Sequence, residues 1–441
     1  MVLEPSATSG LLRLCTAGSV DDGKSTLIGR LLYEARAVYE DQLSSVKAAS
    51  RNRGAGPIDF SLFTDGLRAE REQGITIDVA YRYFATARRK FILADTPGHE
   101  QYTRNMATGA STADLAILLV DARHGLREQT RRHARIASLL GISNFVLAVN
   151  KMDLVNFDRG VFETIRDGFT DLVDRKSTLH AIPLSALNGD NVVQRSEETP
   201  WFTGTPLLEY LETVSVDKTA AANPFRFPVQ MVLRPNHEFR GYAGQIASGT
   251  IKPGDTVTIW PSGRQTRVKR IVTWDGDLAL AHAPMSVTIT LEDEVDVSRG
   301  DLITTTAPGI SRRVSAHVVW MDERPLDPRR VYLLKHAART VTAELDRPLA
   351  LNDIGLVTVT ASRPLVFDPY ENNRGTGSFV IIDPATNATA GAGMIVEQLH
   401  EAGSGARDTG AADRLARAAR AAATENEAIE AVRRVLEEIL T

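Results

Sequence analysis

The sequence contains a single cysteine among its 441 residues. One cysteine cannot form an internal disulfide or a multi-cysteine zinc site, which favours a reducing compartment. Long apolar runs are also missing, since the longest, residues 115–120, is far below the ~20 residues that span a bilayer. Residues 1–10 lack both a cationic and an apolar region, so no signal peptide is expected. These absences predict a cytoplasmic protein.

The sequence shows little excess of either charge. It has 51 Lys and Arg against 55 Asp and Glu, a net charge of −4, which predicts no global attraction to nucleic acid. Hydrophobic residues make up 43% and charged residues 24%, which is ordinary globular usage and excludes wholesale disorder. At roughly 100–200 residues per domain, a chain of this length predicts several domains.

Apolar segments and helical patterns alternate through the first half of the sequence. Short apolar segments indicate buried strands at residues 11–17, 90–94, 115–120, 145–149 and 180–184. The stretches between them predict helices at residues 24–33, 127–140 and 160–172. Such alternation is typical of a mostly parallel sheet with helices on both faces. We therefore expect an α/β domain over residues 1–215.

The pattern changes after a linker of small and polar residues at 216–223. Short β-branched segments then follow one another at hairpin spacing, at residues 227–233, 244–251, 256–260, 268–273, 285–291 and 301–304. Evenly spaced strands without intervening helices are typical of β-barrels. We expect one barrel domain at residues 224–310 and a second at residues 311–400.

Residues 401–441 form a tail of different composition. Its first part is rich in Gly and indicates a flexible linker, whereas residues 411–440 are rich in Ala with a weak apolar stripe at helical spacing. Two interpretations of this helical segment stay open. It either faces solvent or docks on a partner.

The strongest functional motif follows the first predicted strand and fits G-x-x-x-x-G-K-[ST]. In this motif backbone N–H groups and the start of the next helix bind phosphates. Lys24 is expected to neutralise the β- and γ-phosphates, and the Ser25 hydroxyl to ligate Mg²⁺. The predicted GTP-binding residues here are Gly18, Ser19, Val20, Asp21, Asp22, Gly23, Lys24, Ser25 and Thr26.

A base-recognition motif, Asn150-Lys151-Met152-Asp153, follows the strand predicted at 145–149. The Asp153 carboxylate can accept hydrogen bonds from guanine N1–H and the 2-amino group. Adenine lacks this donor pair, so Asp153 is expected to select GTP over ATP. Asn150 is expected to contact the base edge and hold the loop, with the Lys151 stem along the purine face.

A third segment, Ser185-Ala186-Leu187, follows the strand predicted at 180–184. We expect it to offer a backbone N–H to guanine O6 and to help fix Asp153. The order of the three segments along the chain supports a guanine-nucleotide site.

A second phosphate motif, Asp95-Thr96-Pro97-Gly98-His99, ends the strand predicted at 90–94. Asp95 is expected to hold Mg²⁺ through a water molecule. Gly98 can bring its N–H to the γ-phosphate because no Cβ blocks the approach. His99 is the expected catalytic residue that orients the attacking water.

The segment Gly74-Ile75-Thr76-Ile77-Asp78 supplies the last expected part of the site. Thr76 is predicted to contact both Mg²⁺ and the γ-phosphate, so that the segment before it responds to hydrolysis. Ile75 and Val20 either form an apolar gate beside His99 or simply pack in the core.

These motifs, in this order and followed by two predicted barrels, resemble the translational GTPases of the elongation factor Tu type. The resemblance covers roughly residues 10–400 and implies an α/β P-loop GTPase domain followed by two β-barrel domains. The phosphate loop has Ser19 and Asp22 where translation factors usually have His. Residues 64–84, residues 95–106, Tyr370-Glu371-Asn372 and Gly377-Ser378-Phe379 instead resemble the GTPase (large) subunits of bacterial sulfate adenylyltransferase, the CysN family.

This resemblance implies a heterodimer or larger complex with a small catalytic subunit. That partner would join ATP and sulfate into adenosine 5′-phosphosulfate and pyrophosphate, while this chain hydrolyses GTP with Mg²⁺. Residues 62–76 and the barrel faces are the expected contacts that differ between nucleotide states. The tail lacks the length of the adenylylsulfate kinase fused to some relatives, so that activity is not expected. The alternative is a translation GTPase that delivers aminoacyl-tRNA.

Overall fold

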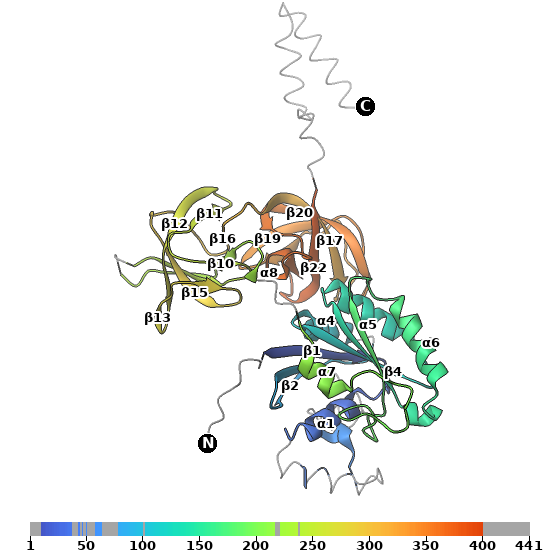
Figure 1. Ribbon diagram of the computed structural model, residues 1–441. Coiled ribbons are helices and arrows are strands. Elements are labelled where there is room, and N and C mark those ends of the chain that lie inside the picture. Colours follow the sequence, from blue (N-terminus) through green and yellow to red (C-terminus); the bar gives the residue numbers. More distant parts are fainter. Residues whose placement is uncertain are drawn as a thin grey trace, which may run out of the picture.

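The computed structural model describes residues 10–37, 43–44, 46, 50, 58–63, 78–99, 102–216, 221–236 and 239–399. Figure 1 shows an α/β domain followed by two β domains. Ile75, Thr76 and the predicted tail at 401–441 lie outside the described residues. Within the described ranges, no helix is long and apolar enough to cross a membrane.

The α/β domain is built on a six-stranded sheet. Its strands lie in the order β2 (Ala80–Ala85), β3 (Lys90–Asp95), β1 (Leu11–Gly18), β4 (Leu115–Asp121), β5 (Asn144–Asn150) and β6 (Thr178–Pro183). Only β2 runs antiparallel to its neighbour; every other pair in this sheet is parallel. The five predicted strands are thus confirmed, and β2 is an edge strand that the apolar pattern did not reveal.

Helices cover both faces of this sheet (Figure 1). One apolar core joins one face of the sheet to α4 (Thr103–Ser111), α5 (Glu128–Leu139) and α6 (Arg159–Thr170). The second core joins the other face to α1 (Lys24–Glu34) and α7 (Leu207–Thr213). Strand β4 is buried at every position, as expected for a central strand covered on both sides. The short 3₁₀ helices are η1 (Phe60–Phe63) and η3 (Met152–Val155).

The second domain is a curved sheet wrapped around its own apolar core. Its main strands lie in the order β7 (Arg226–Pro228), β16 (Leu302–Thr304), β11 (Thr256–Trp260), β12 (Arg264–Thr273), β15 (Ser286–Leu291), β9 (Gly241–Gln245) and β8 (Met231–Leu233). β13 (Gly276–Asp277) pairs with β12, while β10 (Thr250–Ile251) and β14 (Ala281–His282) form a separate pair. The predicted strands at 227–233 and 244–251 are each divided in two.

The third domain is a closed barrel. Its strands follow the order β17 (Gly309–Trp320), β20 (Ile354–Phe367), β19 (Arg339–Leu345), β18 (Tyr332–His336), β21 (Ser378–Ile382) and β22 (Thr389–Gln398), with the short α8 (Arg374–Gly377) before β21. Its interior is filled by residues including Trp320 and Phe367. The prediction of an α/β domain followed by barrels is confirmed.

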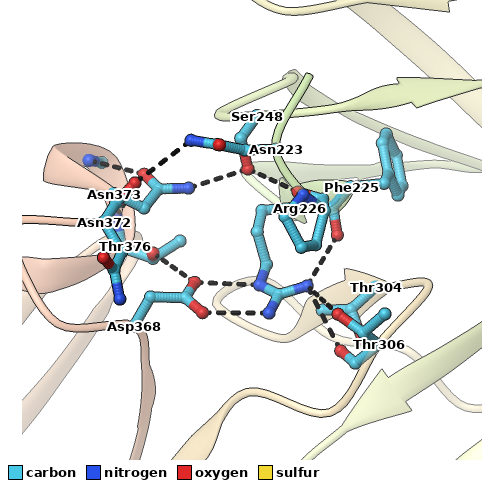
Figure 2. A network of polar contacts seen from close by, with 12 residues as sticks. Asn223, Phe225, Arg226, Ser248, Thr304, Thr306, Asp368, Asn372, Asn373 and Thr376 are labelled. Atoms are coloured by element: carbon cyan, nitrogen blue, oxygen red, sulfur yellow. Dashed lines mark hydrogen bonds and ion pairs between the residues drawn. The ribbon is translucent and has the colours of Figure 1, made fainter. Parts of the chain in front are cut away.

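The third domain contacts both other domains. Asn373 Nδ2 donates to Ser248 Oγ at 2.9 Å, and Asn223 Nδ2 donates to the Asn372 carbonyl at 3.3 Å, so the two β domains meet through polar groups (Figure 2). On the other side, Tyr370 packs into the α4–α5–α6 core of the α/β domain.

Candidate functional site: a guanine-nucleotide cavity

A cavity of about 520 Å³ opens where β1 and β3 end at their carboxyl edge. Parallel α/β sheets bind ligands at this edge because the loops there gather polar groups. The cavity is lined by residues from four separate loops and a helix start: Val20, Asp21, Gly23, Lys24, Ser25, Thr26, Ser61, Gly98, His99, Arg123 and Lys151. The phosphate motif, the second phosphate motif and the base motif therefore meet around one cavity.

The phosphate loop between β1 and α1 is held in a single shape by its own residues. Asp22 Oδ2 accepts a hydrogen bond from the Ser19 amide at 2.7 Å. Burial raises the pKa of Asp22, although the positive charge of Lys24 opposes that shift. Gly23 has φ +93°, and a Cβ there would strike the Asn150 amide. Asp22, which the sequence placed only among the expected GTP-binding residues, thus stabilises the loop by accepting from the Ser19 amide.

Lys24 projects back across the phosphate loop. Its Nζ donates to the carbonyls of Gly18 at 3.1 Å and Ser19 at 2.7 Å. Burial lowers the pKa of Lys24, while Asp22, Asp95 and Asp21 favour its charged form. Phosphate oxygens entering the cavity would supply the nearby negative charge that a buried ammonium requires.

Gly98 lies directly against this ammonium. A Cβ at Gly98 would overlap Lys24 Nζ and would lie only 3.0 Å from the Gly18 carbonyl oxygen. No other residue type fits this position without displacing Lys24. Lys24 therefore requires a residue without a Cβ at position 98, while the approach of the Gly98 N–H to the γ-phosphate stays a prediction.

The other residues of the second phosphate motif divide between the core and the cavity. Asp95 is 2% exposed, and its Oδ1 accepts from Thr16 Oγ1 at 3.4 Å. Thr96 is buried and donates its hydroxyl to the Thr16 carbonyl, and Pro97 is buried beside it. His99 lines the cavity, with its ring centroid 6.1 Å from that of Tyr102.

Asn150 joins the base motif to the phosphate loop. Its Nδ2 donates to the Asp22 carbonyl at 2.8 Å, and its Oδ1 accepts from the Ala186 amide at 2.9 Å. The loop-holding role predicted for Asn150 is thus visible in the structure. In the segment expected to offer a backbone N–H to guanine O6, the Ala186 amide donates to Asn150.

Lys151 is fixed by two groups on the neighbouring loops. Its Nζ donates to the Asp21 carbonyl and lies 3.0 Å from Asp121 Oδ2. Burial opposes ionisation of Asp121, but hydrogen bonds from Arg123 and Lys151 outweigh it and hold the pKa of that carboxyl well below its usual range. Arg123 binds both Asp121 oxygens, at 3.0 and 2.7 Å, and also lines the cavity.

The remaining base-motif residues differ in exposure. Met152 is buried in the apolar core, whereas Asp153 is half-buried. Ser185 is buried and forms an isolated antiparallel β-bridge with Asp190, whereas Leu187 is 57% exposed. The Leu187 carbonyl accepts from Arg30 Nη2 at 3.1 Å, which ties this loop to α1.

Several residues of the site were not predicted from the sequence. They are Ser61, Asp121, Arg123, Thr130 and His133. Thr130 and His133 lie on α5 and contact the phosphate loop without lining the cavity. None of the five belongs to a phosphate or base motif. For Asp121 the sequence held a weak indication of a role in the site, because Asp121 is the last residue of the apolar strand β4 just as Asp95 is the last residue of β3.

Comparison with known proteins agrees with this geometry. The family model "Elongation factor Tu GTP binding domain" matches residues 10–217, and "GTP-eEF1A C-terminal domain-like" matches residues 346–396. A "Sulfate adenylyltransferase subunit 1" from Tolumonas auensis is 54% identical over 411 residues, which cover 88% of this chain and 87% of the relative. One from Shewanella oneidensis is 54% identical over 89% of this chain and 86% of the relative.

A "Bifunctional enzyme CysN/CysC" from Rhodopirellula baltica is 53% identical over 88% of this chain but only 64% of its own length. Identity above 50% along nearly the whole chain exceeds what a shared GTP-binding domain alone would produce. The chain is a GTPase whose GTP-binding domain matches that of elongation factor Tu, and it belongs to the sulfate adenylyltransferase subunit 1 family.

Proposed function

We propose that GTP hydrolysis on this chain drives sulfate activation on a partner, the small catalytic subunit of sulfate adenylyltransferase. The observation that carries the proposal is the assembled cavity, in which Lys24, Gly98 and His99 converge, in a chain of this family. The relatives are named subunit 1, which supports a complex with another subunit. The proposed reaction consumes GTP and ATP, and these substrates favour the cytoplasm as the place where it occurs.

On the partner, a sulfate oxygen would attack the α-phosphorus of ATP. The bond from that phosphorus to the bridging oxygen breaks, which gives adenosine 5′-phosphosulfate and releases pyrophosphate. Forming this phosphate–sulfate anhydride is uphill, so a second reaction must drive it. GTP hydrolysis can do so only if the two nucleotide states of this chain bind the partner differently.

On this chain, Lys24 and the backbone N–H groups of residues 18–26 would bind the β- and γ-phosphates. Mg²⁺ suits the site, because it usually takes few protein ligands and keeps phosphate oxygens and water around it. Ser25 lines the cavity and the buried Asp95 ends β3 behind it, while the described residues contain no cluster of three acidic, His or Cys ligands. Ser25, Thr76 and, through water, Asp95 would hold the ion, which neutralises phosphate charge.

For hydrolysis, His99 would orient a water molecule toward the γ-phosphorus and the Gly98 amide would bind a γ-phosphate oxygen. Attack by this water breaks the bond between the γ-phosphorus and the β–γ bridging oxygen and yields GDP and phosphate. Val20 lines the cavity beside His99 and would form one side of the apolar gate, with Ile75 as the other.

Guanine would lie against the Lys151 stem, with its N1–H and 2-amino group bonded to Asp153. The ion pair between Lys151 and Asp121 supports this arrangement, because it fixes the lysine stem beside the loop that carries Asp153. The far side of the base would be closed by Ser185, Ala186 and Leu187. The Ala186 amide would then donate its hydrogen bond to guanine O6 in place of Asn150 Oδ1.

The test measures GTP hydrolysis and phosphosulfate formation together. The purified chain is assayed alone and with the small catalytic subunit, ATP and sulfate, beside a His99→Ala variant. We expect the complete mixture to raise both rates, and the variant to slow both while still binding GDP. If ATP, sulfate and the small subunit leave GTP turnover unchanged, sulfate activation is refuted and aminoacyl-tRNA binding becomes the function to test.

A further inference from the structure

The phosphate loop contacts α5 through two buried side chains of that helix, neither of which lines the cavity. The Gly18 amide donates to His133 Nδ1 at 3.2 Å, and Ser19 Oγ lies 3.4 Å from Thr130 Oγ1. His133 and Thr130 are both fully buried. These contacts hold the first two residues of the loop that must present backbone N–H groups to phosphates.

His133 is a neutral acceptor in this position. Burial, and then the nearby charges of Lys24 and Arg132, lower its pKa to about 3. Because Nδ1 accepts from the Gly18 amide, the proton of the neutral ring lies on Nε2. In this tautomer the Gly18 amide meets an acceptor.

The opposite end of α5 is held by the third domain. Tyr370 Oη donates to the Leu140 carbonyl at 3.0 Å in a buried contact. Arg374 donates to the Gly141 carbonyl through Nη2 and to the Ala113 carbonyl through Nη1 at 3.3 Å. Tyr370 also shares an apolar core with Ile136 of α5.

We propose that His133 is a positioning residue for guanine-nucleotide binding, and that α5 transmits the position of the third domain to it. The seven steps along the chain from His133 to Leu140, the C-cap of α5, span about 10 Å along one rigid helix. A shift of its C-terminal end by a fraction of an ångström therefore reaches His133. The hydrogen bond from the Gly18 amide to His133 is already 3.2 Å long, so a small shift of His133 would break it or move the Gly18 amide with it.

The first experiment measures GDP affinity of the full chain with a fluorescent GDP analogue. His133→Asn keeps an acceptor near the Nδ1 position, whereas His133→Leu is similar in size and removes it. We expect the Leu variant to bind GDP about tenfold more weakly, as for one unmade buried hydrogen bond, and the Asn variant to stay within about threefold of wild type. Circular dichroism confirms that both variants fold.

If His133 had a purely structural role, the Leu and Asn variants would lose GDP affinity to the same extent, or neither would lose it. Equal GDP affinity of the Leu variant and the wild type overturns the positioning role. So does equal weakening of both variants, because only the acceptor atom distinguishes them.

The second experiment tests the connection through α5. Tyr370→Phe removes only the hydroxyl that bonds Leu140, and Tyr242→Phe is the matched control, because its buried hydroxyl bonds Val295 within the second domain. We expect Tyr370→Phe to change GDP affinity severalfold in wild type and not in the His133→Leu background. An unchanged affinity, or the same factor in both backgrounds, overturns the coupling.

The proposal concerns nucleotide binding by this chain alone. Its failure would leave sulfate activation untouched, and the failure of sulfate activation would leave these affinities unchanged.

Discussion

Arg226 and Asp368, which lie 142 residues apart in the sequence, form a bidentate ion pair between the second and third domains (Figure 2). The two bonds, from Nε and Nη2, measure 2.8 and 2.9 Å. Arg226 Nη1 also donates to the carbonyls of Phe225 and Thr306, and Thr376 donates its hydroxyl to Asp368. Bonds within each domain therefore hold both partners of the pair, and the two Arg226–Asp368 bonds join the domains.

We expect Asp368→Asn to destabilise the chain by about 3 kcal/mol, because it leaves the buried Arg226 guanidinium without its counter-charge. Chemical unfolding followed by fluorescence measures this change. The matched control is Asp277→Asn, whose ion pair with Arg270 is exposed and should leave the unfolding midpoint unchanged. Equal midpoints for both variants would show that the domain contact does not depend on this pair.

The steric fit of Gly98 predicts a selective loss of activity. Gly98→Ala places a methyl group against Lys24 Nζ and the Gly18 carbonyl, so either the ammonium or the loop after β3 must move. We expect GTP turnover to fall by about 100-fold or more, the scale of losing one transition-state contact. Gly160→Ala, at the start of α6, is the control and should turn over GTP at the wild-type rate. Near-normal turnover by Gly98→Ala would contradict the assignment.

Base recognition by Asp153 predicts a change of nucleotide preference. Xanthine replaces the 2-amino donor of guanine by a carbonyl acceptor, which an Asn side chain can match with its own amide. Asp153→Asn should therefore lose affinity for GDP by about 100-fold or more and gain affinity for the xanthine analogue. Competition binding with both diphosphates measures this exchange. Retained GDP preference would place the base elsewhere.

The buried His133 predicts a specific dependence of stability on pH. Its pKa falls from 6.5 to about 3 in the folded chain, so below pH 6.5 the unfolded state binds more protons than the folded state. The free energy of unfolding should therefore decrease as the pH drops from 6.5 toward 3, by up to about 1.4 kcal/mol per pH unit from this residue. Unfolding of wild type and His133→Asn at several pH values gives the difference. Parallel curves would show that His133 does not titrate this way.

The α/β domain could be largely predicted because its signals are local in the sequence. Strands buried on both faces read as continuous apolar runs, and β1, β3, β4, β5 and β6 were all found on this basis. Strand β2 was missed since it is an edge strand with only partial burial, and α4 because its small residues make a weak apolar pattern. Two pairs of strands in the second domain were merged. Val229 and Gln230, between β7 and β8, carry no turn signal, whereas Gly249, with φ +80°, separates β9 from β10 and was included in a predicted strand.

The sequence by itself determined the nucleotide chemistry, because each phosphate or base motif is a short loop whose residue types and spacing act within a few bonds. Only the tertiary structure decided how those loops are held. His133 meets Gly18 across 115 residues, Lys151 lies beside Asp121, and Arg226 binds Asp368 in another domain. Such pairs depend on how α5 packs on the sheet and how the barrels meet. No local pattern of residues encodes that packing.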